Sequence, residues 1–374
     1  MPRFLRIVCS ALLLLAAPAR ADEPTRIIAY VAGWSMPPVI EARKLTHINF
    51  AFARINGEGR MVFEDPGYDA AIRSLIALKR DNPALKVLIS VGGWGADGFS
   101  EAALTDTSRE RFAQSGIELL RRTGADGLDI DWEYPGQGVA GIRHRPEDKQ
   151  NFTALLRTLR QRLNEASAAQ GRKGGGRYLL TIASADREFF HFTEMERLHV
   201  LLDWVNVMGY DFFNSLTKTT GHHAGLYASP LAEPTDRNAD ASIRQHLAAG
   251  IPPRKLVLGV AFYGRRFAGV DPPNDGLNQR YEQFVDAPSY RQLAEELIDR
   301  QGFVRRWDDE AKAPFLWNGE TRSFISYEDP QSIHIKADYV REHALGGMMF
   351  WELSQDHDGV LLNVIAESLS TPVP

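Results

Sequence analysis

Eight short apolar runs recur along the chain, and amphipathic segments separate them. The runs have the length and composition of buried β-strands, and the intervening segments have helical periodicity. This alternation is typical of βαβ units, which place parallel strands side by side in one sheet. Eight such units predict a closed (β/α)8 barrel, the TIM barrel fold. The predicted strands are Ile27–Gly33, His47–Ala53, Lys86–Gly93, Gly127–Tyr134, Tyr178–Ala185, Trp204–Asp211, Leu256–Gly264 and Gly347–Leu353.

The spacing of the predicted strands is regular except before the last one. Residues 265–324 are too many for a single crossover helix, so we expect a small inserted subdomain there, within one barrel domain that spans residues 22–374. The insert contains a helix candidate, Ser289–Gln301, and an aromatic-rich run. The other predicted helices are Tyr68–Arg80, Ser108–Thr123, Pro146–Ala166, Ala241–Ala249 and Pro330–His343.

The first 21 residues have the three parts of a secretory signal peptide. Basic residues precede an apolar run, Ile7–Ala17, and the small-residue motif Ala19-Arg20-Ala21 predicts cleavage before Asp22. The apolar run is too short to span a bilayer. We therefore expect a secreted or periplasmic protein that does not associate with a membrane after cleavage. The only cysteine, Cys9, lies within this segment, so the exported chain needs no disulfide.

Charge and histidine spacing exclude several classes of partner. The formal net charge is −5, and it becomes −8 without residues 1–21, which carry three arginines and no acid. No polybasic stretch is present to bind nucleic acid or an anionic membrane. His222 and His223 are adjacent, and the other histidines lack the spacing of metal ligands, so we expect these two to be surface or loop residues. The sequence therefore predicts a protein without metal or cofactor, and we expect a monomer.

The fourth predicted strand lies in the segment DGLDIDWEYP, Asp126–Pro135, and is unusually acidic. Because side chains alternate along a strand, Asp129, Asp131 and Glu133 should share one face, while the apolar residues between them face the other way. Like charges held close together raise at least one pKa, as a general acid near neutral pH requires. The alternative is a solvated or calcium-binding run, but such runs favour loops that contain Asn and Gly.

Aromatic and polar side chains gather where the predicted strands end. In a barrel of this type the functional site lies at the carboxyl ends of the strands. Aromatic side chains at one rim favour sugar binding, because pyranose rings expose C–H faces that pack on them; each residue alone is also compatible with rim packing. The candidates are Tyr30, Trp34, Phe52, Ser90, Trp94, Glu133, Met208, Tyr210, Asp211, Tyr263 and Trp351.

Five motifs together resemble glycoside hydrolase family 18, the chitinases and their relatives, from Tyr30 to Glu352. DGLDIDWE fits the family's D-x-x-D-x-D-x-E signature on the fourth strand. The other matches are SVGG at Ser90–Gly93 to S-x-G-G, MGYD at Met208–Asp211 to M-x-Y-D, and YGRRF at Tyr263–Phe267 and MFWE at Met349–Glu352 to the last two strand ends.

The resemblance implies a substrate-assisted mechanism. Most retaining glycosidases use a second carboxylate as the nucleophile, and the family is an exception because the substrate supplies the nucleophile. Glu133 would be the catalytic acid and base, and the carbonyl oxygen of the substrate's 2-acetamido group would be the nucleophile. Asp131 would accept the acetamido N–H, Asp129 would support Asp131, and Tyr210 would donate to the acetamido carbonyl. By the same resemblance, Ser90 and Tyr30 would hold Asp129, and Asp211 would lie beside Tyr210. Trp351 would lie under the sugar that is cleaved, Trp94 would bind the leaving-group sugar, and Tyr263 would form a side wall of the sugar site. Phe52 and Met208 would also contact the substrate.

The implied activity is hydrolysis of β-1,4-linked N-acetylglucosamine polymers or oligomers, chitin first. Two alternatives remain: an endo-β-N-acetylglucosaminidase that acts on N-glycan or peptidoglycan, and a non-catalytic chitin-binding lectin, although such lectins typically lack the acid at the position of Glu133. Phe212-Phe213-Asn214 departs from the D-F-H-G continuation that is common in the family, so the family's leaving-group contacts do not carry over to these positions. The insert is shorter than the family's full insertion domain, which predicts a more open cleft and either internal cleavage of a polymer or a soluble oligomer as substrate.

Overall fold

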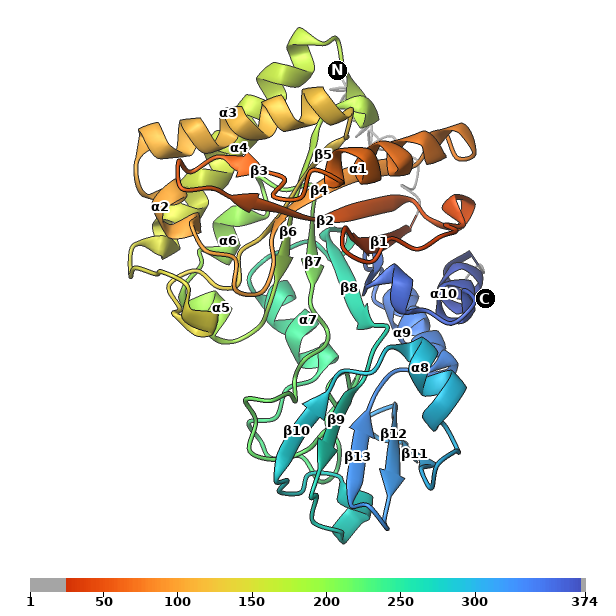
Figure 1. The fold of residues 1–374 in the computed structure, drawn as a ribbon. Helices are drawn as coiled ribbons and strands as arrows, with labels where there is room; N and C mark the ends of the chain where they lie inside the picture. Colours follow the sequence, from red (N-terminus) through yellow and green to blue (C-terminus); the bar gives the residue numbers. More distant parts are fainter. Residues whose placement is uncertain (1–24, 371–374) are drawn as a thin grey trace, which may run out of the picture.

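The barrel is closed by eight parallel strands in the computed structural model, which describes residues 25–370 (Figure 1). The strands pair in the order β1-β14-β8-β7-β6-β5-β4-β2, and β1 pairs with β2 to close the ring. The predicted fold is therefore confirmed, whereas the predicted signal peptide lies outside the described residues. The barrel strands are β1 Arg26–Ala32, β2 His47–Ile55, β4 Lys86–Gly92, β5 Gly127–Asp131, β6 Leu179–Ser184, β7 Trp204–Val207, β8 Leu256–Ala261 and β14 Gly347–Trp351.

Helices surround the barrel, and side chains cap the starts of α3, α7 and α9. Thr105 and Ser108 form a capping box at the start of α3, and Asp329 and Ser332 form another at the start of α9. Each capping box supplies partners for backbone N–H groups that have none within the helix. The helices are α1 Tyr68–Ala77, α2 Phe99–Leu104, α3 Asp106–Thr123, α4 Asp148–Ala169, α5 Glu188–His191, α6 Met195–Leu198, α7 Ala239–Ala248, α9 Pro330–Glu342 and α10 Val360–Ser370.

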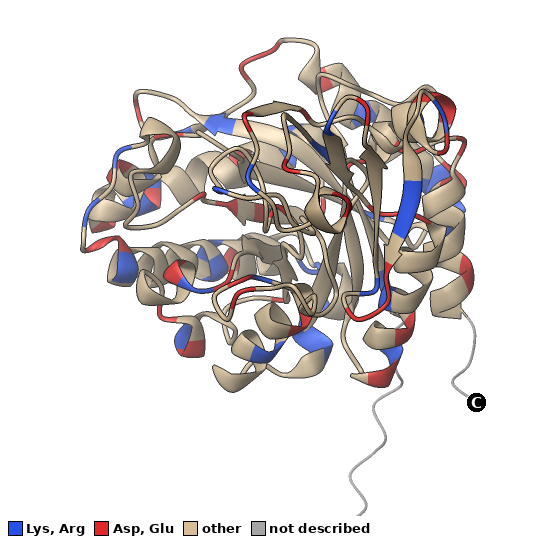
Figure 2. Cartoon of the chain, turned by 90° about the horizontal axis from the view of Figure 1, so that it is seen from below, with Lys and Arg blue, Asp and Glu red and all other residues tan. Residues whose placement is uncertain are grey.

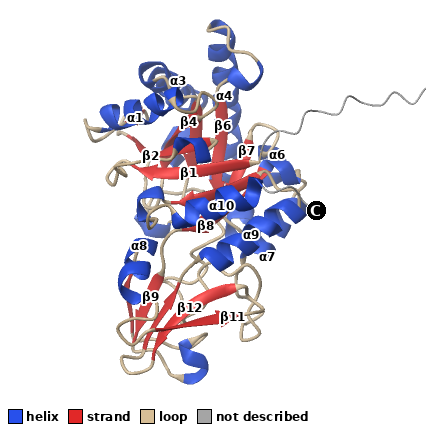
Figure 3. Ribbon diagram, turned by 90° about the vertical axis from the view of Figure 1, so that its right-hand side faces the viewer, coloured by secondary structure: helices blue, strands red, loops and turns tan. Residues whose placement is uncertain are grey.

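A second, antiparallel sheet lies between β8 and β14 in the sequence and below the barrel in Figure 1. Its five strands pair in the order β10-β9-β13-β12-β11, and the same sheet is seen from the side in Figure 3. A separate apolar cluster around Phe267 and Trp317 forms its core. The strands are β9 Arg265–Ala268, β10 Gln283–Asp286, β11 Val304–Asp308, β12 Ala313–Asn318 and β13 Ser323–Ser326, and the short β3, Met61–Val62, pairs with β2.

The helix expected over Ser289–Gln301 is shorter than predicted. One turn, α8 Tyr290–Gln292, begins at the Ser289 cap and continues as a wide π-type turn over Leu293–Leu297. Beyond it, Asp299 and Gln301 have left-handed φ angles of 54° and 52°, which a continuing helix does not allow. Composition alone did not reveal this change of direction.

The barrel strands separate two apolar layers. On β5, Leu128 and Ile130 pack in the cluster between strands and helices, whereas Asp129 lies buried on the inner side. Lys and Arg are interspersed with Asp and Glu over the outer helices (Figure 2). No helix within residues 25–370 has both the length and the apolar character needed to cross a membrane.

Candidate active site

The acidic row is held at the rim by the apolar side of β5. Trp132 is buried and stacks on Phe99 with ring centroids 5.3 Å apart and an interplanar angle of 13°. The sequence predicted a strand that continues to Tyr134. Strand β5 ends at Asp131, however, so Glu133 lies just beyond the strand. The anchored tryptophan therefore fixes the point at which the chain leaves the strand and presents Glu133 at the rim.

Asp129 lies inside the barrel and accepts four hydrogen bonds. Its Oδ2 accepts from the hydroxyls of Tyr30 at 2.7 Å and Ser90 at 2.8 Å. Its Oδ1 accepts from Thr181 Oγ1 at 2.5 Å and from Asn206 Nδ2 at 3.1 Å. The donors come from four different strands, β1, β4, β6 and β7. This carboxylate therefore joins five of the eight barrel strands.

Thr181 and Asn206 are donors that sequence reasoning missed. Burial raises the pKa of Asp129, and the hydrogen bonds, with Thr181 first, lower it in part. Asn206 is itself held by the indole of Trp204, whose Nε1 donates to Asn206 Oδ1 at 3.0 Å. A signal was present, because each is a polar residue within an apolar strand and a buried polar group needs a partner.

Asp131 and Glu133 have a different environment from Asp129. Asp131 is buried, and among the described residues its Oδ1 has no hydrogen-bond partner. Burial, followed by the charges of Glu133 and Asp129, raises its pKa well above the usual range of an aspartate. Burial also raises the pKa of Glu133, to about 7, while a hydrogen bond from Tyr134 lowers it in part. Glu133 is therefore suited to hold a proton near neutral pH.

Tyr210 and Asp211 follow β7 and differ in how they are held. Among residues 25–370, the hydrogen-bond partner of the Tyr210 hydroxyl is Met349 Sδ, at 3.9 Å, and a thioether sulfur is a weak acceptor. Asp211 accepts from Arg265 Nε at 2.7 Å and lies 3.7 Å from His223 Nδ1. Burial raises the pKa of Asp211, but His223 and the charge of Arg265 lower it to about 2. Asp211 is therefore a fixed anion, whereas the Tyr210 hydroxyl remains available to a ligand.

Aromatic rings form a continuous surface beside the carboxyls. Trp351 stacks on Phe52 with centroids 5.5 Å apart and lies 5.6 Å from Tyr30. Trp34, which is 60% exposed, extends this surface at 6.2 Å from both Phe52 and Trp351. Trp94 is 54% exposed and contacts Tyr134 instead, with centroids 6.3 Å apart. Two exposed tryptophans thus lie beside different parts of the site, one near Trp351 and one near the residue that follows Glu133.

Most of the residues predicted from the sequence come together. Tyr30, Phe52, Tyr210 and Tyr263 belong to one apolar cluster, with Met208 and Trp351 packed against it. Tyr263 also lies 6.2 Å from Tyr210 and beneath Arg265. Of the predicted aromatic residues, Trp34 and Trp94 lie outside this cluster.

His222 and His223 lie in a loop, as expected, but this part of the loop is buried and not at the surface. His222 is 5% exposed and its Nε2 lies 3.1 Å from Asp308 Oδ2, while His223 is fully buried behind Asp211. The loop turns inward because the second sheet covers it, which the histidine pair alone could not indicate. Within residues 25–370, no three His, Cys, Asp or Glu side chains are grouped to hold a metal ion.

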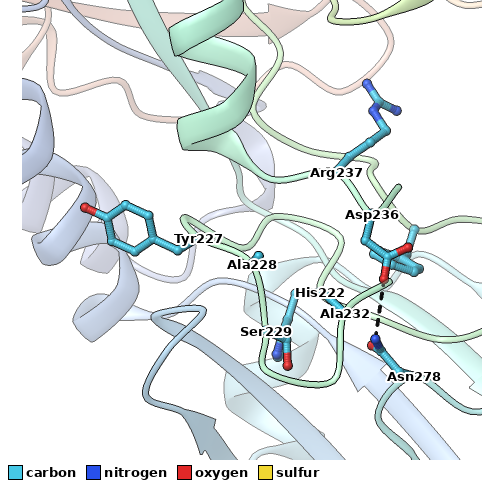
Figure 4. Close-up of a pocket in the computed structure, with 9 residues that line it drawn as sticks. His222, Tyr227, Ala228, Ser229, Ala232, Asp236, Arg237 and Asn278 are labelled. Carbon is cyan, nitrogen blue, oxygen red and sulfur yellow. Dashed lines mark hydrogen bonds between the residues drawn. The ribbon is translucent and has the colours of Figure 1, made fainter. Parts of the chain in front are cut away.

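A small pocket, shown in Figure 4, has none of the three carboxyl residues in its lining. Most of its lining comes from the loop between β7 and α7, and Asn278 from the turn before β10 contributes the rest. Asn278 Nδ2 lies 3.5 Å from Asp236 Oδ2 across it. The lining residues are Phe213, His222, Tyr227, Ala228, Ser229, Ala232, Asp236, Arg237 and Asn278.

Comparison with known proteins identifies relatives over nearly the whole chain. The family model described as glycosyl hydrolases family 18 matches residues 26–356. Chitinase A1 of Niallia circulans is 35% identical across 98% of this chain, and chitinase B of Serratia marcescens is 32% identical across 85% of it. The chain spans 62% of the length of the first and 74% of the second. A family 18 N-acetylglucosaminidase from Paenibacillus barengoltzii has a similar structure, with a TM-score of 0.86 and 40% identity over 92% of this chain and 99% of that one.

Proposed function

The chain belongs to the glycosyl hydrolases of family 18, and from this membership we propose that it hydrolyses β-1,4-linked polymers of N-acetylglucosamine, chitin or chitooligosaccharides. One observation supports the proposal most directly. A carboxyl with a raised pKa, Glu133, stands next to a buried carboxyl, Asp131, whose Oδ1 has no partner among the described residues. An acid beside an unsatisfied acceptor suits a substrate that brings both a glycosidic oxygen and an amide N–H.

The proposed first step is substrate-assisted. The carbonyl oxygen of the 2-acetamido group attacks the anomeric carbon, the bond to the leaving sugar breaks, and Glu133 gives its proton to the leaving oxygen. Asp131 accepts the acetamido N–H and stabilises the positive charge of the resulting oxazolinium ion. The Tyr210 hydroxyl, which has only a sulfur contact, donates to the acetamido carbonyl and so orients the nucleophile.

The second step restores the enzyme. Water attacks the anomeric carbon from the side that the leaving group vacated, and the carboxylate of Glu133 takes its proton as general base. Two displacements at one carbon give retention of configuration. Asp129 acts at a distance, because its four hydrogen bonds keep it in place beneath Asp131.

The aromatic surface supports binding of a chain of several sugars. In the proposal Trp351 is the floor under the sugar that is cleaved, with Phe52, Met208 and Tyr263 around it. Trp34 extends the surface beyond Trp351, and Trp94 extends it on the side of Tyr134. Aromatic contacts on both sides favour internal cleavage of a polymer over removal of single terminal sugars.

Other activities are separated by a digestion experiment. Chitin oligomers, an N-glycan and peptidoglycan are incubated side by side, and early products are sized and their anomers read by proton NMR. We expect chitin oligomers to be cleaved internally, with β-anomers formed first. Release of single N-acetylglucosamine from the outset would favour an N-acetylglucosaminidase, as the Paenibacillus barengoltzii protein is. Binding without any turnover would favour a lectin.

Export is part of the same proposal. We expect residues 1–21 to direct the chain across the inner membrane, since they combine basic residues, a short apolar run and a small-residue cleavage motif. Mass spectrometry of the intact protein from culture medium and periplasm would locate the mature start. A start at or near Asp22 is the expected result, and an intact Met1 in the cytoplasmic fraction would contradict it.

A further inference from the structure

Arg54 is a cation at the acidic rim that none of the proposed catalytic steps uses. It lies on β2, two residues beyond Phe52, and its guanidinium carbon is 5.4 Å from the centroid of the Phe52 ring. Its Nη1 donates to the carbonyl oxygen of Gly92 at the end of β4. The side chain is thus held on an aromatic face and at one hydrogen-bond acceptor, which fixes where its charge lies.

The acceptor of this hydrogen bond packs directly on the backbone of Asp131. Gly92 is opposite Asp131 in the β4–β5 register and has a φ of 122°. A Cβ atom at this position would lie 2.0 Å from the carbonyl oxygen of Asp131, so only glycine fits. The next N–H, that of Gly93, donates to the same carbonyl oxygen at 2.9 Å. Arg54 therefore fixes the turn against which the Asp131 backbone rests.

The charge of Arg54 acts on both rim carboxyls. Burial raises the pKa of Asp131 most, the charges of Glu133 and Asp129 raise it further, and Arg54 opposes them. Burial also raises the pKa of Glu133 most, the charge of Asp211 adds to this, and Arg54 again opposes.

The other cations near the rim are engaged elsewhere. Arg265 bonds to Asp211, and Arg237 bonds to Asp186 at the end of β6. The charge of Arg54 also lowers the pKa of Tyr68, which burial and the nearby acids Asp65 and Glu64 raise. Arg54 is the arginine whose charge bears on Asp131 and Glu133 together.

We propose that Arg54 is a positioning residue that holds the Gly92–Gly93 turn against Asp131 and sets the pH range in which Glu133, beside Asp131, carries the proton that it gives to substrate. The proposal rests on the hydrolase function given above. It assigns Arg54 no contact with substrate, so its effect should appear in the pH profile rather than in binding.

The test compares variants that keep or remove the charge. Arg54→Lys keeps it, whereas Arg54→Gln and Arg54→Met remove it, and methionine retains an apolar stem over Phe52. The measurement is kcat/KM from pH 4 to pH 9 on a chromogenic β-glycoside of N,N′-diacetylchitobiose. We expect both limbs of the profile to move to higher pH by about 0.5–1 unit in the two neutral variants, because loss of a nearby cation raises carboxyl pKa values. Arg54→Lys should retain the wild-type limbs, and KM should change little.

A matched control is Arg60→Gln. Arg60 lies beyond β2 on the same hairpin and pairs with Glu118 of α3 on the outside of the barrel. Its loss removes one positive charge without touching the Gly92 turn, so the limbs should stay in place. If a neutral Arg54 variant lost activity while both limbs of its pH profile stayed at the wild-type pH, the proposal would be overturned. Arg54 would then have only a structural role. A shift in Arg54→Lys as large as that in Arg54→Gln would also overturn it.

A second readout does not depend on turnover. Carbon-13 NMR of labelled Asp and Glu carboxyl groups follows their titration directly, and Glu133→Gln identifies the signal of Glu133. In Arg54→Gln, or in Arg54→Met if the glutamine variant does not fold, the Glu133 signal should titrate at higher pH than in the wild type. An unchanged titration would reject the inference. Absence of turnover in the wild type would instead reject the proposed function and leave this titration as the test.

Discussion

Two regions of the barrel carry carboxyls only two residues apart, and their environments are opposite. Inside the barrel, Asp129 accepts hydrogen bonds from four donors on four strands. At the rim, Asp131 has an oxygen with no partner among the described residues, and Glu133 has a pKa raised to about 7. The inner region is thus complete without a ligand, whereas the rim is not.

The difference indicates which hydrogen-bond donors the protein supplies and which are left for the substrate to supply. A buried polar atom without a partner costs about 1–3 kcal/mol, so each such atom calls for an explanation. The protein's own donors fix Asp129. For Asp131, which lies at the rim, we propose that the acetamido N–H of the substrate is the partner. The predictions that follow change one region at a time.

The largest effect is expected from the rim acid. Glu133→Gln keeps the shape of the side chain and removes its proton, so turnover of chitin oligomers should fall by about 10³-fold or more while their binding is retained. In the wild type, kcat/KM should fall as pH rises through about 7, because only the protonated form of Glu133 can donate. Steady-state kinetics and calorimetric titration measure the two quantities. Turnover of the Glu133→Gln variant within tenfold of the wild-type value would contradict the assignment of Glu133 as the catalytic acid.

The second largest effect is expected at the unsatisfied carboxyl. Asp131→Asn replaces a carboxyl, which can ionise and then accept the amide N–H, with an amide that cannot ionise, so kcat should fall by about 10²-fold. The pH profile should also change, because Asp131 and Glu133 act on each other's protonation. Initial rates across pH 4 to 9 provide the measurement. A lower rate with an unchanged profile would argue against a role for Asp131 in proton sharing.

A smaller effect on rate, with a clear effect on stability, is expected from the inner region. Thr181→Val removes one of the four donors to Asp129, which should lower the free energy of unfolding by about 1–3 kcal/mol and reduce kcat by less than tenfold. Thr153→Val is the matched control, because Thr153 is buried on α4 and its hydroxyl has no partner among the described residues. Urea unfolding compares the two. Equal free energies of unfolding for both variants would mean that the hydrogen bond from Thr181 to Asp129 does not stabilise the fold.

The smallest effect is expected at the exposed aromatic residues. Trp34→Ala and Trp94→Ala should leave the free energy of unfolding within about 0.5 kcal/mol of wild type, since both side chains are more than half exposed. KM for a chitin hexamer should rise about fivefold, which corresponds to about 1 kcal/mol, while a disaccharide glycoside should be affected less. An equal effect on both substrates would place the tryptophans outside the extended binding surface.

Much of the fold could be predicted because apolar runs mark buried strands, and all eight barrel strands lie where the runs occur. The strand ends and the loops were less predictable. Glu133 lies beyond β5 rather than within it, and His222 is buried because the second sheet covers its loop. Thr181 and Arg54 were missed because their partners lie on neighbouring strands: the β5–β6 pairing brings Thr181 beside Asp129, and the β2–β4 pairing brings Arg54 to the end of β4.

The central claim is that the substrate's acetamido group supplies what the rim lacks. Digestion of partly deacetylated chitin tests it, because both sugars are present and only one carries the acetamido group. The new reducing ends are identified by mass spectrometry after early cleavage. The account predicts that every new reducing end is N-acetylglucosamine, since only that sugar provides the nucleophile and the partner for Asp131. Glucosamine at new reducing ends, in proportion to its abundance in the polymer, would contradict it.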